Sequence, residues 1–213
     1  MKRRFLAHWA LGLAALGALA LPLASHAADE APDAFIKRLS AETLDAIKAD
    51  PALRGGDVNK VMQLVDTRII PNVDFPRMTA AAVGPQWRQA TPDQQKRLQD
   101  EFKTLLVRTY SGALAQVSDQ SVNVKPLRAS PDDKEVVVRT EVVGRGDPIQ
   151  LDYRLEKTPG QGAGWKIYNL NVLGVWLVET YRSQFAQEIN AKGVDGLIAT
   201  LAARNRSNSG QRS

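Results

Sequence analysis

The chain has 213 residues, 44% of them hydrophobic, a formal net charge of +5 at pH 7, and no cysteine. Its only two histidines, His8 and His26, lie close to the N-terminus. Beyond residue 27 the sequence therefore excludes Ser-His-Asp triads, Cys-His pairs, disulfides and zinc sites built from histidine or cysteine.

The first 27 residues have the pattern of a secretory signal peptide. A basic start, MKRR, precedes the apolar run ALGLAALGALALPLA, and the small residues Ser25 and Ala27 mark a cleavage site. We expect residues 1–27 to be removed and the product to be periplasmic, without a lipid anchor. Removal takes away three cations and no acids, so the formal net charge falls from +5 to +2. A charge this small gives little support to nucleic-acid binding.

Apolar spacing of three and four residues predicts helices in the first half of the chain. One helix is expected over residues 33–49 and a second over 57–69, which Pro71 ends. A short helix is expected to begin at Asp74 and to end near Gly84.

The clearest helix is predicted from Thr91 to about Val117. Thr91 is a suitable N-cap, Pro92 suits the first helical position, and Gln94 completes a capping box. One stripe of this helix is apolar and contains Phe102, Leu106, Tyr110 and Leu114.

After this helix the apolar period changes to two, which predicts strands. Four are expected, over residues 121–127, 134–145, 149–157 and 164–172, with turns rich in Pro, Gly and Asp between them. Their alternation gives a sheet with one apolar and one polar face. The last strand is ambiguous, because its apolar residues change parity along the strand, and a β-bulge would resolve this.

Two more helices are predicted, over about 175–190 and 194–204, before a disordered polar tail at 206–213. The order of helices, antiparallel strands and helices predicts an α+β domain over residues 28–205, in which helices cover the apolar face of the sheet. Leu177, Tyr181, Phe185 and Ile189 form a stripe on the first of these two helices. Such stripes are either ordinary core or one wall of a ligand pocket between helices and sheet.

Two long stretches carry motifs in a specific order. The first, VDTRIIPNVDFPRMTAAAVGPQWRQATPDQQKRLQDEFKTLLVRTYSGAL, contains VDF, RMT, a glycine followed by WRQAT, and FKTLLVRTY. The second is WKIYNLNVLGVWLVETYRSQFAQEINAKGVDGLIATL. Together they resemble the signature of the MlaC family, also called the toluene-tolerance auxiliary proteins. Two positions depart from the family pattern: Asn169 stands where an acid is common, and Trp176 stands where a serine is common, near the implied pocket.

The resemblance implies a nuclear-transport-factor-2-like α+β fold, with an antiparallel sheet of about four strands and extra helices at both ends. It implies a periplasmic phospholipid carrier, not an enzyme, that holds acyl chains in an apolar pocket. Such a carrier would pass lipid between an outer-membrane lipoprotein–porin complex and an inner-membrane ABC transporter complex in the Mla lipid-asymmetry pathway. No metal or organic cofactor is implied, and we expect a monomer.

The sheet and the two helical stripes supply the residues expected to line this pocket. They are Phe75, Met78, Trp87, Leu106, Tyr110, Leu114, Val138, Leu151, Tyr153, Leu170, Val172, Val175, Leu177 and Tyr181.

Two other functions are consistent with the residues alone. A protein-binding module or periplasmic chaperone without lipid cargo would expose its apolar surface to clients. An isomerase or dehydratase would need an acid beside a tyrosine in an apolar cavity, with Asp152 and Tyr153 or Tyr168 as the nearest candidates. Neighbours in a regular strand point to opposite faces, so Asp152 and Tyr153 cannot share one cavity.

Overall fold

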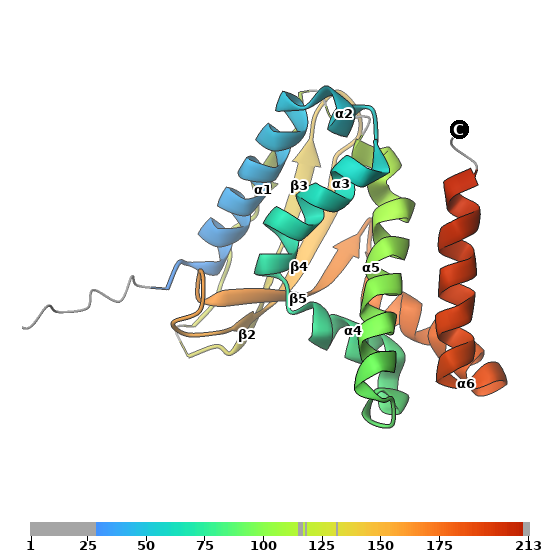
Figure 1. The fold of residues 1–213 in the computed structure, drawn as a ribbon. Helices are drawn as coiled ribbons and strands as arrows, with labels where there is room; N and C mark the ends of the chain where they lie inside the picture. The colour runs from blue at the N-terminus through green and yellow to red at the C-terminus, as the bar shows by residue number, and fades with distance from the viewer. Residues whose placement is uncertain (1–28, 115–116, 118, 131, 211–213) are drawn as a thin grey trace, which may run out of the picture.

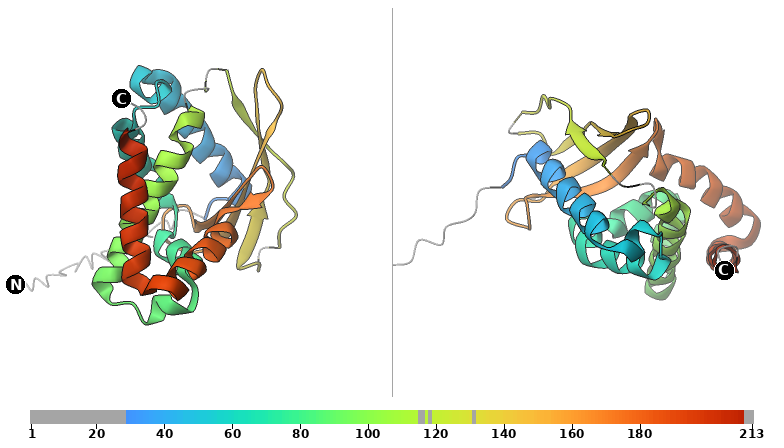
Figure 2. Two further views of the ribbon diagram at one scale, coloured as in Figure 1. Left: turned by 90° about the vertical axis from the view of Figure 1, so that its right-hand side faces the viewer. Right: turned by 90° about the horizontal axis from the view of Figure 1, so that it is seen from above.

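The computed structural model describes residues 29–210, except for residues 115, 116, 118 and 131, and omits the side chains of Leu114 and residues 208–210. The predicted signal peptide lies outside the described residues. An antiparallel sheet carries helices α1, α3 and α5 on one side (Figure 1, Figure 2). The predicted α+β fold is therefore confirmed. Within the described part of the chain, no helix is long and apolar enough to cross a membrane.

The helices follow the predicted order, with one short additional helix, α2, and three irregular segments. The first half contains α1 (Pro32–Ala49), α2 (Pro51–Arg54), α3 (Val58–Leu64), α4 (Phe75–Val83) and α5 (Pro92–Leu114). A π-helix, η1 (Val65–Ile69), and two 3₁₀ turns, η2 (Ile70–Asn72) and η3 (Gly84–Arg88), join them, and α6 (Leu177–Gly210) closes the chain.

Side chains at the helix ends explain where α4 and α5 begin. The capping box of α5 is formed as predicted: the Thr91 N–H donates to Gln94 Oε1 at 2.9 Å, and the Gln94 N–H donates to Thr91 Oγ1 at 3.2 Å. In α4, the Arg77 N–H donates to Asp74 Oδ1 at 2.8 Å. Gly84 ends α4 with φ of 78°, a conformation that glycine adopts readily.

The sheet contains six strands among the described residues, two more than predicted. They are β1 (Ser121–Val124), β2 (Glu135–Val138), β3 (Thr140–Val143), β4 (Ile149–Lys157), β5 (Trp165–Val172) and β6 (Val175–Trp176). The strand predicted over 134–145 is two strands, because the Asp152 carboxylate accepts the Thr140 N–H at 3.1 Å and interrupts the ladder. The last helix begins at Leu177, since the two residues before it pair with β5.

A β-bulge in β5 resolves the ambiguous parity of that strand. Arg154 of β4 pairs with Asn169, whereas the next residue, Leu155, pairs with Ile167, so the register skips Tyr168. The extra residue turns the second half of β5 over. As a result, Ile167 before the bulge and Leu170 after it face the same side of the sheet as the apolar residues of β4.

Helix α6 changes direction at Gly193, as the predicted break between two helices requires. Gly193 has φ of 71° and ψ of −176°, and the two arms on either side of it run in different directions (Figure 2). The second arm lies beside α5, where Asn205 Nδ2 donates to Glu101 O at 3.0 Å (Figure 1). This arm continues to Gly210, into the segment expected to be a disordered tail.

The described apolar residues form three buried clusters instead of one. The first joins α4, α5 and α6 around Phe102, whose ring centroid lies 4.9 Å from that of Tyr181 and 5.2 Å from that of Phe185. The second joins α1 to the sheet through Phe35 and Leu155. The third joins α1, α2, α3 and α5.

Replacing Gly193 by alanine should destabilise the fold through the backbone alone. A Cβ at Gly193 would meet no atom within 4 Å, but its φ and ψ lie in a region that is essentially restricted to glycine. We expect Gly193→Ala to lower the free energy of unfolding by about 1–3 kcal/mol, measured by urea denaturation. Gly146→Ala is the matched control, because Gly146 is equally open and has no positive φ. Equal effects in the two variants would contradict this explanation.

Candidate functional site

The three apolar clusters meet around a cavity between the sheet and the helices. Its volume is about 510 Å³, and it reaches residues of α1, α3, η1, α4, α5, α6 and four strands. This volume lies within the range of ordinary ligand sites. The cavity therefore occupies the position where a single hydrophobic core would otherwise lie.

Cross-strand pairs of β4 and β5 form the sheet wall of the cavity. Leu151 pairs with Val172 and Tyr153 pairs with Leu170, and all four line the cavity. Without the bulge at Tyr168 the pairing would shift by one residue. Leu170 and Val172 would then point to the face of the sheet away from Leu151 and Tyr153. The bulge is therefore the local feature that makes this wall continuously apolar.

Three helices form the opposite wall. Helix α1 contributes Leu39, Ser40, Thr43, Leu44 and Ile47, and α3 with the π-helix η1 contributes Val61, Leu64, Val65 and Ile69. Helix α5 contributes Lys103, Leu106, Val107, Tyr110, Ser111 and Ala113. Because the spacings within each set follow the helical repeat, each helix turns one stripe toward the cavity.

Part of the cavity lining is exposed to solvent, at the end of α5 and at the start of β4. Two of its large apolar lining residues are exposed there: Tyr110 by 36% and Ile149 by 44%. Other large lining residues, such as Phe75 and Leu177, are almost completely buried. The gradient from buried to exposed residues gives the cavity an inner end and a mouth.

Polar groups are few within the cavity. Lys103 is the single charged residue among the described lining residues, and its Nζ lies 2.7 Å from Asp66 Oδ1 in η1. Burial raises the pKa of the Tyr153 phenol to about 12, and the hydroxyls of Ser40 and Thr140 oppose that shift. This site therefore offers apolar surface with one cation, and no acid–base pair.

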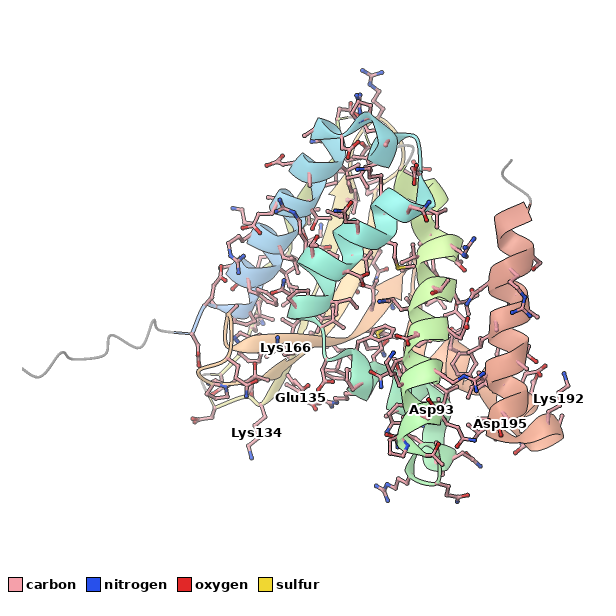
Figure 3. All side chains as sticks on the ribbon, in the orientation of Figure 1. Asp93, Lys134, Glu135, Lys166, Lys192 and Asp195 are labelled. Atoms are coloured by element: carbon pink, nitrogen blue, oxygen red, sulfur yellow. The ribbon has the colours of Figure 1, made fainter. Side chains whose placement is uncertain are left out.

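The outer face of the sheet carries the charged groups that the cavity lacks. Arg77 pairs with Glu156 and, at 2.6 Å, with Glu135, and its guanidinium lies 3.7 Å from the centroid of the Tyr168 ring. Figure 3 shows Glu135 with Lys134 and Lys166 at this end of the sheet. These contacts join α4 to β2, β4 and β5 outside the cavity.

A second group on the outer face involves both positions that depart from the family pattern. Trp176 does not line the cavity; its ring centroid lies 4.0 Å from the Arg154 guanidinium. Asn169 Nδ2 donates to Glu179 Oε2 at 2.7 Å, and its Oδ1 accepts the Val178 N–H at 3.1 Å. The pKa of the Glu179 carboxyl is lowered: burial alone would raise it, but the hydrogen bonds from Arg154 and Asn169 outweigh burial. The family pattern puts Trp176 near the implied pocket, whereas the structure places it outside the cavity lining.

The enzyme candidates considered from the sequence do not come together. Asp152 is buried on the face opposite the cavity, where it accepts hydrogen bonds from Thr140 and Gln150. Tyr168 donates to Glu135 on the outer face. Among the described residues no group of three potential metal ligands is present. A second recess, of about 410 Å³ beside β2, is lined by several charged residues, including Arg128 and Glu135.

Comparison with known proteins decides the family. The sequence model described as MlaC protein matches residues 37–203. This chain belongs to the MlaC family. It is 30% identical over 178 residues to the toluene tolerance protein ttg2D of Pseudomonas putida, covering 83% of this chain and 80% of that protein. It is 20% identical over 176 residues to the intermembrane phospholipid transport system binding protein MlaC of Haemophilus influenzae, covering 82% of each.

A solved structure agrees with the fold. It is a phospholipid-binding protein from Ralstonia solanacearum in complex with a phospholipid. The two chains are 50% identical, and the TM-score is 0.79 over 83% of this chain and 98% of the other. The sheet and helices described above are therefore shared with a lipid-bound relative.

Nine of the residues proposed from the sequence line the cavity of this MlaC-family chain. They are Phe75, Met78, Leu106, Tyr110, Leu151, Tyr153, Leu170, Val172 and Leu177. The side chain of Leu114, at the end of α5, lies outside the described structure.

Four proposed residues lie away from the cavity. Tyr181 packs against Phe102 in the buried cluster of α4, α5 and α6, and Trp87 packs against the same cluster. Val138 is fully buried between α1 and the sheet. Val175, in the edge strand β6, is 50% exposed. The sequence patterns gave the apolar character of these residues but not which packing layer each one enters.

The largest omission from the sequence prediction is the wall formed by α1 and α3. The apolar stripes predict both helices, and these stripes are the available signal for the wall. They do not assign the helices to the pocket, because a stripe that lines a cavity has the same spacing as one that packs in a core.

Replacing Tyr153 by phenylalanine should reduce the loss of stability at high pH. With its pKa raised to about 12, the folded phenol keeps its proton between pH 10 and 12, whereas the unfolded one loses it. The stabilisation is therefore present below pH 10 and is lost as the pH rises toward 12, by roughly 3 kcal/mol. Urea denaturation at roughly pH 9, 10.5 and 11.5, which span this window, measures how steeply the free energy of unfolding falls with pH.

The control is Tyr110→Phe, at the exposed mouth of the same cavity. Tyr110→Phe should retain most of the alkaline slope, and Tyr153→Phe should lose a clear part of it. An unchanged slope in Tyr153→Phe would show that another group is responsible.

Proposed function

We propose that this protein is a periplasmic phospholipid carrier that holds acyl chains in the cavity between the sheet and α1, α3 and α5. The observation that carries this proposal is the cavity lining, which is apolar apart from Lys103 and a few uncharged polar groups. The phospholipid bound to the Ralstonia solanacearum relative, at 50% identity, supports the same conclusion.

The energetics of transfer fit a protein without catalytic groups. Each CH₂ group moved from water to an apolar site contributes about 0.8 kcal/mol, so a free lipid in water is strongly disfavoured. Transfer from a membrane into an apolar cavity changes the free energy much less, because the chain is dry in both places. The protein then provides a dry compartment for crossing water, and the direction of transport comes from its partners.

We further propose that the partners are an outer-membrane lipoprotein–porin complex and an inner-membrane ABC transporter complex. The description of the Haemophilus influenzae relative as the binding protein of an intermembrane phospholipid transport system supports this proposal. The predicted signal peptide at residues 1–27 supports location between the two membranes.

A protein-binding module explains the structure less well. Its apolar surface should face solvent, and the large exposed apolar residues of the described chain are Tyr110, Ile149, Leu173 and Val175. Two of them line the cavity mouth. The greater part of the unpaired apolar surface is inside, where it fits an acyl chain and not a protein client.

An acidic side chain inside the cavity should abolish lipid binding. Leu151→Glu places a charge on the sheet wall, opposite α5, where acyl chains would have to desolvate it. We expect a folded variant whose lipid occupancy falls at least tenfold, an order-of-magnitude estimate from the cost of burying a charge. Native mass spectrometry of protein purified from periplasmic extracts measures this occupancy.

Val175→Glu is the matched control, because Val175 is also apolar and lies in the same sheet but is exposed at its edge. It should retain the wild-type occupancy. Wild-type lipid occupancy in Leu151→Glu would contradict the assignment of this cavity as the lipid site. A wild-type protein that remains empty after exposure to liposomes would contradict the carrier function itself.

A further inference from the structure

Among the described residues that line the cavity, Lys103 is the one that carries a charge. It lies on α5 in the same stripe as Leu106 and Tyr110, three and seven residues further along, and all three line the cavity. Its side chain is 25% exposed, so the ammonium group is at the boundary between the apolar interior and solvent. A cation at such a boundary can contact both an enclosed ligand and water.

The partner of Lys103 is supplied by the irregular segment opposite α5. Asp66 belongs to the π-helix η1, in which the Ile70 N–H donates to Val65 O. Val65 and Ile69 of this segment line the cavity, whereas Asp66 is turned outward and its side chain is 45% exposed. The Nζ to Oδ1 contact of 2.7 Å therefore spans the gap between η1 and α5 at the cavity boundary.

This pair is suited to exchange. A partly exposed ion pair between two flexible side chains contributes little to stability, so replacing one anion with another costs little. An incoming phosphodiester offers the same charge as the Asp66 carboxylate and likewise shares it over two oxygens that accept charge-assisted hydrogen bonds. The other lining residues that the structure describes carry no charged group that could compete for it.

We propose that Lys103 binds the phosphate of the lipid headgroup, displacing Asp66, and gives the cavity its preference for phospholipids over uncharged lipids with the same chains. This inference rests on the proposed carrier function. Lys103 acts as a specificity-determining residue: the apolar walls hold the chains of any diacyl lipid, and the ammonium group selects those that carry a phosphate. When no lipid is bound, the Asp66 carboxylate forms the ion pair with the Lys103 ammonium group.

The test is a competition between two lipids that differ only in the headgroup. Delipidated protein is mixed with equal amounts of phosphatidylglycerol and diacylglycerol with identical acyl chains in detergent micelles, and native mass spectrometry counts each bound species. Wild type should favour phosphatidylglycerol by about tenfold, the scale of one charge-assisted hydrogen bond at a partly exposed site. Lys103→Met should bind both lipids equally while still binding diacylglycerol, which also shows that it is folded.

Three further variants separate anchoring from other roles of the pair. Lys103→Arg keeps the cation and should keep the preference. Asp66→Asn removes the competing carboxylate and should increase the preference for phosphatidylglycerol. If the ion pair were purely structural, Asp66→Asn and Lys103→Met would change the ratio of the two bound lipids in the same direction. Lys96→Met is the control: Lys96 is on the same helix, pairs with Asp100 and is 75% exposed, so its loss should leave the ratio unchanged.

The outcomes are distinct. A wild-type protein that binds neither lipid overturns the carrier function. Equal binding of both lipids by wild type, an unchanged ratio in Lys103→Met, or an equal loss in Lys96→Met overturns the role of Lys103 but not the carrier. Glycerol phosphate without chains should not bind; if it binds and Lys103→Met abolishes that binding, the group is a site for soluble anions and the headgroup proposal is wrong.

Discussion

The structure depends on holding apolar walls apart without filling the space between them. In most domains of this size the covering helices would close onto the sheet and form one contiguous core. Here three buried clusters, centred on Phe102, Leu155 and Val61, support the edges of a cavity and leave its middle open. The helix α5 packs against α6 on one side and presents its other side to the cavity. Stability and binding are in this way assigned to different faces of the same helices.

This separation suits a carrier better than a catalyst. A site that exchanges cargo with membranes must bind well enough to shield it and weakly enough to release it, and apolar surface gives a nearly balanced exchange with a bilayer. On the outer face of the sheet, Arg77 and Arg154 join secondary-structure elements together through ion pairs. Lys103 stands at the boundary between the cavity and solvent. The cavity is thus lined mainly by apolar residues, and ion pairs join the secondary-structure elements outside it.

Local chemistry in the sequence predicted most of the elements, whereas long-range geometry determined the site. Thr91 and Gln94 predicted the start of α5, because a capping box involves only neighbours in the chain. The break at Arg139 and the short strand β6 could not be predicted in the same way, since they depend on Asp152 and on pairing with β5. Residues of the cavity were recognised as apolar, but the spacing that buries Tyr181 in a core is the same spacing that places Leu177 on the cavity. Only the packing of the elements against one another distinguishes these cases.

The bulge in β5 makes the number of residues in this strand as important as their identity. Successive side chains along a strand point to opposite faces of the sheet, and the bulge at Tyr168 shifts this alternation by one residue. Loss or gain of one residue after it would turn Leu170 and Val172 away from the cavity and bring Asn169 and Asn171, which are buried on the other face of the sheet, onto the cavity wall, changing an apolar wall into one of amides. Substitutions can therefore adjust the shape of the compartment one side chain at a time, while length changes in this strand would reverse its polarity at a single step.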